Sequence, residues 1–194
     1  MEWVQWVAAI AGAISVYLSA RENIWSWPTA IVNVGLYIFV FYESGLYSDM
    51  GLQVVYLALS IYGWYEWLYG GAQRTALHVT RASALEWSVG AIGAIVFVLV
   101  IGRFTSTLPG VAFPYLDASL TAISLVAQWM MTRKKLENWV LWIIADIVYV
   151  PMYLVKHLAV TSALYVVFLG LAVMGLVEWR RSYARDREAR LAPA

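Results

Sequence analysis

The stretch Asn138–Val155, NWVLWIIADIVYVPMYLV, decides the class of this protein. It carries a single charged side chain, that of Asp146, and as a helix it is long enough to cross a bilayer, which takes about 20 apolar residues. Similar stretches recur along the chain, so we predict an all-α polytopic membrane protein with seven transmembrane helices. The other expected spans are Trp3–Ser19, Trp25–Tyr42, Asp49–Tyr69, Glu86–Phe104, Val111–Met131 and Ala159–Trp179.

The composition excludes several classes of protein. Of the 194 residues, 62% are hydrophobic and only 13% are charged, too few charges to cover the surface of an ordinary soluble enzyme. The formal net charge of +1 gives no reason to expect a nucleic-acid partner. Without cysteine there is no disulfide or thiolate site, and no catalytic or metal-binding motif is present. We therefore predict no catalytic residues, no metal and no cofactor, and hence not an enzyme.

The basic residues predict the orientation. If seven spans alternate in direction, only Arg103 and Lys156 of the 13 Lys and Arg residues fall on one side of the membrane. Because cytoplasmic loops carry an excess of Lys and Arg, the N-terminus is expected outside and the C-terminus in the cytosol. Tryptophans near the span ends are expected at the membrane–water interface. These are Trp3, Trp6, Trp25, Trp67, Trp87 and Trp179.

Two short patterns recur and indicate an internal repeat. Glu-Asn opens the second and sixth spans at Glu22 and Glu137, and Gly-x-x-Glu-Trp closes the third and seventh spans, beginning at Gly63 and Gly175. We predict two parallel three-helix repeats joined by a fourth helix, a 3+1+3 plan used by some transporters. The expected units are a first repeat (residues 1–70), a connector (71–110), a second repeat (111–179) and a basic tail (180–194).

Polar side chains inside the membrane point to a site. In the sixth span, Trp139, Trp142, Asp146, Tyr149 and Tyr153 follow one another at helical spacing and share one face. A carboxylate near the bilayer midplane is costly unless it faces water, a partner or a ligand. Flanking aromatic rings suit a flat solute that carries hydroxyl groups or a positive charge. The structural alternative is a hydrogen bond that locks two helices, with Trp139 as an interfacial anchor.

Other spans offer further polar or aromatic faces. A single hydroxyl usually bonds to its own helix, but polar faces on several inner helices together predict a water-lined cavity. The further candidate substrate-binding residues are Asn33 and Tyr37 in the second span, Gln53 and Tyr56 in the third, and Thr121 and Gln128 in the fifth.

Residues 22–67 carry the motifs WPxxI and LYxDxxLQ, and residues 137–168 carry WxxWxxxD followed by Thr-x-x-x-Tyr. With these motifs the two stretches resemble the PnuC family of nicotinamide riboside transporters. The resemblance implies a fold like that of SWEET sugar transporters and facilitated diffusion across a bacterial cytoplasmic membrane, with a cytosolic kinase trapping the substrate. It also implies that Trp139, Trp142, Asp146 and, less securely, Gln53 contact the ligand.

The cargo stays open among flat vitamins. A pyridinium riboside fits the aromatic and polar residues, and so does thiamine; riboflavin and nucleosides are carried by relatives in the family. A phosphorylated substrate is disfavoured, because no Lys or Arg lies in the interior of a span. A non-transporting seven-helix sensor is a rival, though the short loops offer no output domain. The expected partners are the small-molecule substrate and the lipid bilayer, and the Gly and Ala content permits a homo-oligomer.

Overall fold

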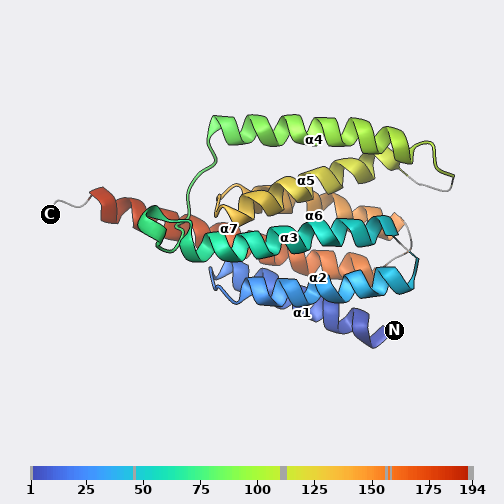
Figure 1. Ribbon diagram of the computed structural model, residues 1–194, viewed down its shortest axis with the longest axis horizontal. Helices are drawn as coiled ribbons and strands as arrows, with labels where there is room; N and C mark the ends of the chain where they lie inside the picture. Colours follow the sequence, from blue (N-terminus) through green and yellow to red (C-terminus); the bar gives the residue numbers. More distant parts are fainter. Residues whose placement is uncertain (1, 46, 110–112, 156, 158, 192–194) are drawn as a thin grey trace.

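The computed structural model describes residues 2–45, 47–109, 113–155, 157 and 159–191. These residues form seven α-helices that lie side by side along the long axis of the molecule, with the two chain ends at opposite ends (Figure 1). The helices are α1 (Glu2–Ala20), α2 (Ser26–Glu43), α3 (Tyr47–Tyr69), α4 (Ala84–Thr105), α5 (Pro114–Thr132), α6 (Asn138–Val155) and α7 (Ala159–Leu191). The prediction of an all-helical protein is confirmed.

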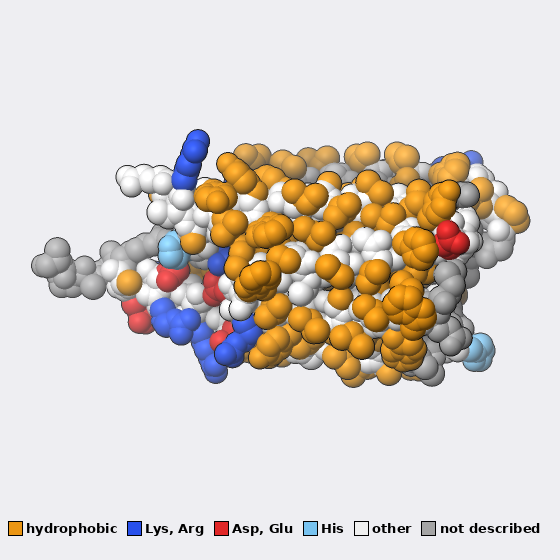
Figure 2. Space-filling model, turned by 60° about the horizontal axis from the view of Figure 1, so that its bottom comes forward, with side chains coloured by type: hydrophobic (Ala, Val, Ile, Leu, Met, Phe, Trp, Pro, Cys, Tyr) orange, Lys and Arg blue, Asp and Glu red, His pale blue; other side chains and the backbone are white. Residues whose placement is uncertain are grey.

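Four of these helices contain stretches long and apolar enough to cross a membrane by length and composition. The stretches are Trp3–Ala20, Ala84–Thr105, Asn138–Val155 and Thr161–Ala189. The remaining helices α2, α3 and α5 have lengths of 18 to 23 residues and carry six of the eleven predicted site residues. Hydrophobic side chains cover the body of the molecule, and charged side chains gather at one end, the charged end (Figure 2).

Helix packing closes six helices into a ring. Helices α1, α2 and α3 pack in sequence order, as do α5, α6 and α7. The two groups meet where α1 packs against α7 and α3 packs against α5. Within the described residues, α4 packs extensively against α5 alone, and it lies along the outside of the other helices (Figure 1).

The helix ends have local causes. Helix α4 begins with a capping box in which Ser83 accepts from the Glu86 backbone N–H and Glu86 accepts from that of Ser83. Helix α5 begins at Pro114, because proline is favoured in the first turn; Val111, the expected start of this span, lies outside the described residues. Helix α7 was expected to end at Trp179 but continues to Leu191, so the described part of the tail is helical.

The connection between α3 and α4 is tied across the charged end. The Thr80 backbone N–H donates to the Lys134 carbonyl at 3.0 Å, and the Leu136 N–H donates to the Thr80 carbonyl at 2.9 Å. Arg81 pairs with Glu137 at 3.0 Å. These contacts fix the connector against the turn between α5 and α6. Of the two cations expected at the other end, Arg103 lies in the last turn of α4, and Lys156 lies outside the described residues.

Candidate functional site

Four tyrosines from three helices meet near Asp146, and we call them the tyrosine cluster. Tyr149 and Tyr153 of α6 stack with ring centroids 5.7 Å apart, and Tyr165 of α7 lies 4.8 Å and 5.0 Å from them. The hydroxyl groups of Tyr56 of α3 and Tyr149 both face Ser124 of α5. Because Tyr149 and Tyr153 are four residues apart, one helical turn brings them together. The cluster therefore joins helices of both three-helix groups.

Asp146 lies almost one turn before Tyr149 on α6. It is only 3% exposed and interacts electrostatically with Tyr165. Among the described residues, no group hydrogen-bonds to its carboxylate. Buried carboxylates are normally hydrogen-bonded, since desolvation is costly. The described chain therefore leaves the Asp146 carboxylate available to accept hydrogen bonds from a solute.

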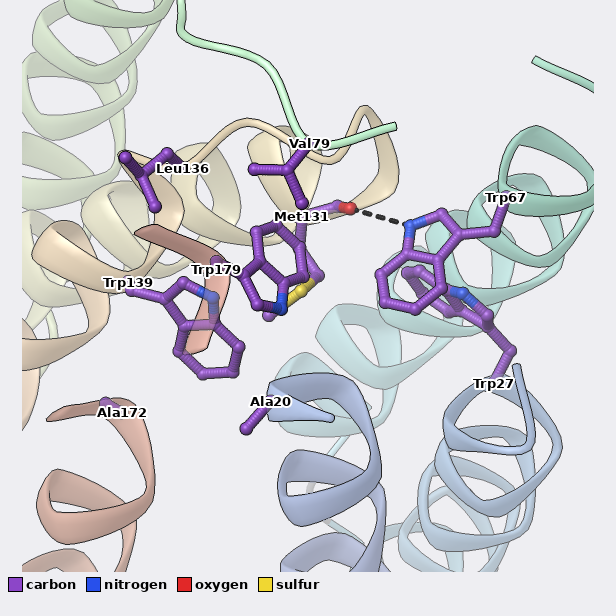
Figure 3. Packing of buried hydrophobic residues seen from close by; sticks show 9 residues of the cluster. All are labelled: Ala20, Trp27, Trp67, Val79, Met131, Leu136, Trp139, Ala172 and Trp179. Carbon is purple, nitrogen blue, oxygen red and sulfur yellow. Dashed lines mark hydrogen bonds between the residues drawn. The ribbon is translucent and has the colours of Figure 1, made fainter. Parts of the chain in front are cut away.

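The predicted face of α6 divides between two places. Trp139 is 1% exposed and packs edge-on against Trp179, with centroids 5.5 Å apart, in the core at the charged end (Figure 3). Trp142 is partly buried against the same core. Tyr149 and Tyr153 instead belong to the tyrosine cluster. A ligand reaches the Trp139 ring only if this core opens, so the binding role of Trp139 stays a prediction.

Of the two predicted residues of α2, Asn33 contacts α1 and Tyr37 packs within its own helix. The Asn33 Nδ2 donates to the Ala8 carbonyl at 2.6 Å, which fastens α2 to α1. Tyr37 stacks on Phe41 of the same helix, with centroids 5.7 Å apart. The amide nitrogen of Asn33 thus has a structural partner, and its role in substrate binding remains a prediction.

Gln53 of α3 and Thr121 and Gln128 of α5 are half-buried. Within the described part of the chain, none of the three makes a side-chain hydrogen bond to another protein group. Amides with free donors and acceptors can bind hydroxyl groups of a solute. Their exposure agrees with the predicted role but does not test it.

Trp67 and Trp179 are not interfacial residues, contrary to the expectation from their position near span ends. They are 3% and 0% exposed and lie 5.8 Å apart, between the two helix groups (Figure 3). The Trp67 Nε1 donates to the Met131 carbonyl of α5, and the Trp179 Nε1 donates to the Ser19 carbonyl of α1, both at 3.0 Å. Each indole therefore bonds to the opposite group. The other four tryptophans expected at the interface are exposed.

An ion pair between Lys134 and Glu22 lies beside Trp67 and Trp179. We call these four residues the charged-end brace. The Lys134 Nζ lies 2.9 Å from Glu22 and 4.6 Å from the centre of the Trp67 ring. Lys134 and Glu22 follow α5 and α1, and both have positive φ angles, 49° and 54°. Beside them, Arg133 donates to the Tyr62 hydroxyl at 2.9 Å, which raises the pKa of the Arg133 guanidinium.

The brace and its surroundings repeat at one spacing in the sequence. Glu22 and Lys134 are 112 residues apart, and the same spacing separates Trp67 from Trp179 and Ser19 from Met131. Two edge-on ring contacts are related in the same way. Trp27 and Trp67 have ring centroids 5.3 Å apart and an interplanar angle of 90°, and their equivalents Trp139 and Trp179 have a distance of 5.5 Å and an angle of 89°. Four buried polar atoms lack a hydrogen-bond partner within the described chain, and they form two pairs at this spacing. They are Ser26 Oγ with Asn138 Oδ1, and Trp27 Nε1 with Trp139 Nε1.

The Glu-Asn pattern does not follow this spacing. Glu22 pairs with Lys134, whereas Glu137 pairs with Arg81 and accepts from the Ala82 N–H at 2.8 Å. The two glutamates therefore make different contacts, and only the Gly-x-x-Glu-Trp pattern marks equivalent positions.

Sequence reasoning left Tyr165 out of the predicted binding residues, although it contacts two of them. The sequence pattern around Tyr165 was a weak indication of a site, because Thr161 and Tyr165 at helical spacing could equally face lipid or pack against another helix. Its position between Tyr149 and Tyr153 depends on how α7 packs against α6, which spacing along one helix does not reveal.

Comparison with known proteins identifies the family. The sequence model of the family described as nicotinamide mononucleotide transporter matches residues 2–181. The chain belongs to this family. It is thus a multi-pass protein of a membrane transporter family, and the resemblance noted from the motifs is confirmed.

Named relatives span nearly the whole chain. The nicotinamide riboside transporter PnuC of Escherichia coli (strain K12) is 30% identical, covering 98% of this chain and 90% of the relative. The riboflavin/roseoflavin transporter RibM of Streptomyces davaonensis is 28% identical over 95% of this chain and 87% of the relative. The crystal structure of the vitamin B3 transporter PnuC is similar in fold, with a TM-score of 0.71 and 26% identity over 94% of this chain and 83% of that structure.

Proposed function

We propose that this protein takes up nicotinamide riboside by facilitated diffusion across a bacterial cytoplasmic membrane, and that cytosolic phosphorylation then traps the substrate. The observation that carries the proposal is Asp146, a buried carboxylate with no hydrogen bond from the described chain, beside the tyrosine cluster. A ribose hydroxyl can donate to this carboxylate, and a positively charged pyridinium ring can lie over tyrosine faces. The names of several relatives support the same cargo.

The proposed architecture is a 3+1+3 plan, with repeats at residues 1–70 and 111–179 and α4 in the connector, 71–110. It is supported by the reciprocal packing of α1 on α7 and α3 on α5, and by the contacts that recur at a spacing of 112 residues. If the repeats are related by a two-fold axis, residues that lie near it contact their own equivalents. Trp67 with Trp179, and Glu22 with Lys134, have this relationship.

The proposed mechanism is alternating access, with the charged end in the cytosol and the N-terminus outside. In this conformation the charged-end brace closes the path to the cytosol, since it joins the two three-helix groups there. Release of the substrate then requires Trp67 to part from Trp179 and Glu22 to part from Lys134. Rocking of one repeat against the other would produce this opening. Facilitated diffusion of the substrate needs no coupling ion.

An unphosphorylated cargo fits the helices better than a nucleotide. Helices α1, α2, α3, α5 and α6 contain no Lys or Arg, so nothing in them can neutralise a phosphate dianion within the membrane. The second candidate cargo is riboflavin, which the relative RibM favours. Thiamine is a further candidate cargo because, like nicotinamide riboside, it has a flat ring with a positive charge.

Calorimetric binding to the purified protein distinguishes these cargoes. Nicotinamide riboside, thiamine, riboflavin and nicotinamide mononucleotide are titrated in parallel, and counterflow of labelled solute into vesicles then tests transport. We expect tight binding and counterflow of nicotinamide riboside alone. Binding of riboflavin or thiamine instead would change the proposed cargo and leave the proposed mechanism unchanged. Binding without counterflow would make the protein a sensor and overturn the proposal.

A further inference from the structure

A polar cleft at the charged end lies between the two helix groups, apart from Asp146 and the tyrosine cluster. It has a volume of about 270 Å³ and is lined by Ala20, Arg21 and Glu22 at the end of α1, and by Glu178 and Arg185 of α7. Its walls therefore come from both groups. It adjoins the charged-end brace, because Glu22 pairs with Lys134 and the neighbouring Ser19 accepts from Trp179.

The charges around this cleft do not cancel. Each glutamate already has a cation, since Glu22 pairs with Lys134 at 2.9 Å and Glu178 pairs with Arg181 at 3.3 Å. Within the described chain, neither Arg21 nor Arg185 forms an ion pair. Two guanidinium groups thus line one small cleft without a carboxylate of their own, an arrangement that favours an anion.

The residues at the equivalent positions in the other three-helix group form an ion pair that the cleft lacks. Arg133 and Glu66 lie 112 residues from Arg21 and Glu178, and they approach each other to 3.9 Å. Arg21 and Glu178 both line the cleft but make no such pair. Glu178 pairs instead with Arg181, the equivalent of Tyr69 at the end of α3, and α7 continues beyond this point to Leu191. The cleft therefore occupies the position of a missing ion pair, and the longer α7 adds Arg185 to it.

We propose that this cleft binds the phosphate group of a small anion through Arg21 and Arg185. Guanidinium groups present paired donors that match phosphate oxygens, so two of them can hold a phosphate monoester or a phospholipid headgroup. An anion held there bridges α1 and α7 next to the brace and keeps the charged end closed. This effect on transport rests on the proposed function, whereas the binding itself does not.

The binding test uses ribose 5-phosphate, with ribose as its uncharged match, titrated into the full-length protein in detergent. We expect ribose 5-phosphate to bind and ribose not to bind. Arg21→Ala and Arg185→Ala should each weaken binding by about tenfold or more. Arg187→Ala is the control, because Arg187 is exposed on the same helix and does not line the cleft. Absence of binding, or an equal loss in the Arg187 variant, would overturn the proposal.

Two further measurements identify the source of the phosphate and its effect. In vesicles of phosphatidylcholine with phosphatidylglycerol, weaker binding of ribose 5-phosphate than in phosphatidylcholine alone assigns the cleft to a lipid headgroup. Equal binding assigns it to a free phosphate. Counterflow of nicotinamide riboside should slow with ribose 5-phosphate present in wild type and not in the Arg185→Ala variant. Counterflow that fails in every variant, with phosphate binding intact, would refute the cargo and leave the anion site standing.

Discussion

Replacing Gly175 by alanine tests how closely α6 and α7 must pack. A Cβ atom on Gly175 would lie 2.5 Å from Cε2 of Trp139. Carbon atoms in contact normally lie about 3.5–4.0 Å apart, so the added methyl group requires a shift of about 1 Å. Trp139 has little room for such a shift, since it is 1% exposed and its ring packs edge-on against Trp179.

The size of the effect follows from two opposing contributions. Alanine is a better helix former than glycine by about 0.8–1.0 kcal/mol, which alone would stabilise α7. Forcing an extra carbon into a packed core typically costs about 1–3 kcal/mol in free energy of unfolding. We expect the second contribution to exceed the first at Gly175. At Gly170 of the same helix no atom lies within 4 Å of the added Cβ, so only the favourable contribution applies.

Thermal unfolding of the two variants in the same detergent measures this difference. The net cost is then up to about 2 kcal/mol, and with about 2–4 °C per kcal/mol for a chain of this size, Gly175→Ala should lower the midpoint by up to about 9 °C. Gly170→Ala should leave the midpoint unchanged or raise it. Gly63→Ala should also lower it, because a Cβ there would overlap the Trp27 ring. If Gly175→Ala and Gly170→Ala behaved alike, the close contact of α6 with α7 would be wrong.

Three further predictions concern the site and the brace. Asp146→Asn should keep substrate binding within about tenfold, because an amide oxygen still accepts a hydroxyl, whereas Asp146→Ala should weaken binding about 10- to 150-fold by calorimetry. Trp142→Ala should weaken binding of a cationic ring by about 0.5–2 kcal/mol in the same titration, while an unchanged affinity would remove Trp142 from the site. Glu22→Gln leaves Lys134 without its carboxylate and weakens the brace by about 1.5–3 kcal/mol. A cysteine placed at buried Ser19, in a chain that has none of its own, should then react at least about tenfold faster with a maleimide. The swap of Glu22→Lys with Lys134→Glu should restore protection, and failure to do so would contradict the brace.

The helices themselves were predictable from the sequence. Helix α6 has the predicted bounds, Asn138–Val155, because its apolar run ends at polar turns on both sides. The end of α7 was not predictable in the same way. An apolar run locates the part of a helix that lies in lipid, but a helix can continue in water through good helix formers such as the arginines and alanines after Trp179.

The tryptophans show where sequence reasoning stops. A tryptophan near the end of a span serves equally well at the lipid interface or in a core, because its ring is apolar and its N–H needs one acceptor. What separates Trp179 from Trp3 is the acceptor, the Ser19 carbonyl at the end of another helix. Local spacing cannot supply that contact. The repeated Gly-x-x-Glu-Trp pattern was the available signal, since repetition at equivalent places favours a shared structural role.

The same spacing of 112 residues also shows where the two halves differ. Tyr37 and Phe41 stack as Tyr149 and Tyr153 do, at the same centroid distance of 5.7 Å. The position equivalent to Asp146 is Val34, which is buried at 6% exposure. Both halves thus keep the packing, while only the second places a carboxylate there. A symmetric brace with an asymmetric polar site suits a carrier whose halves move alike but whose small, asymmetric solute is recognised mainly by one of them.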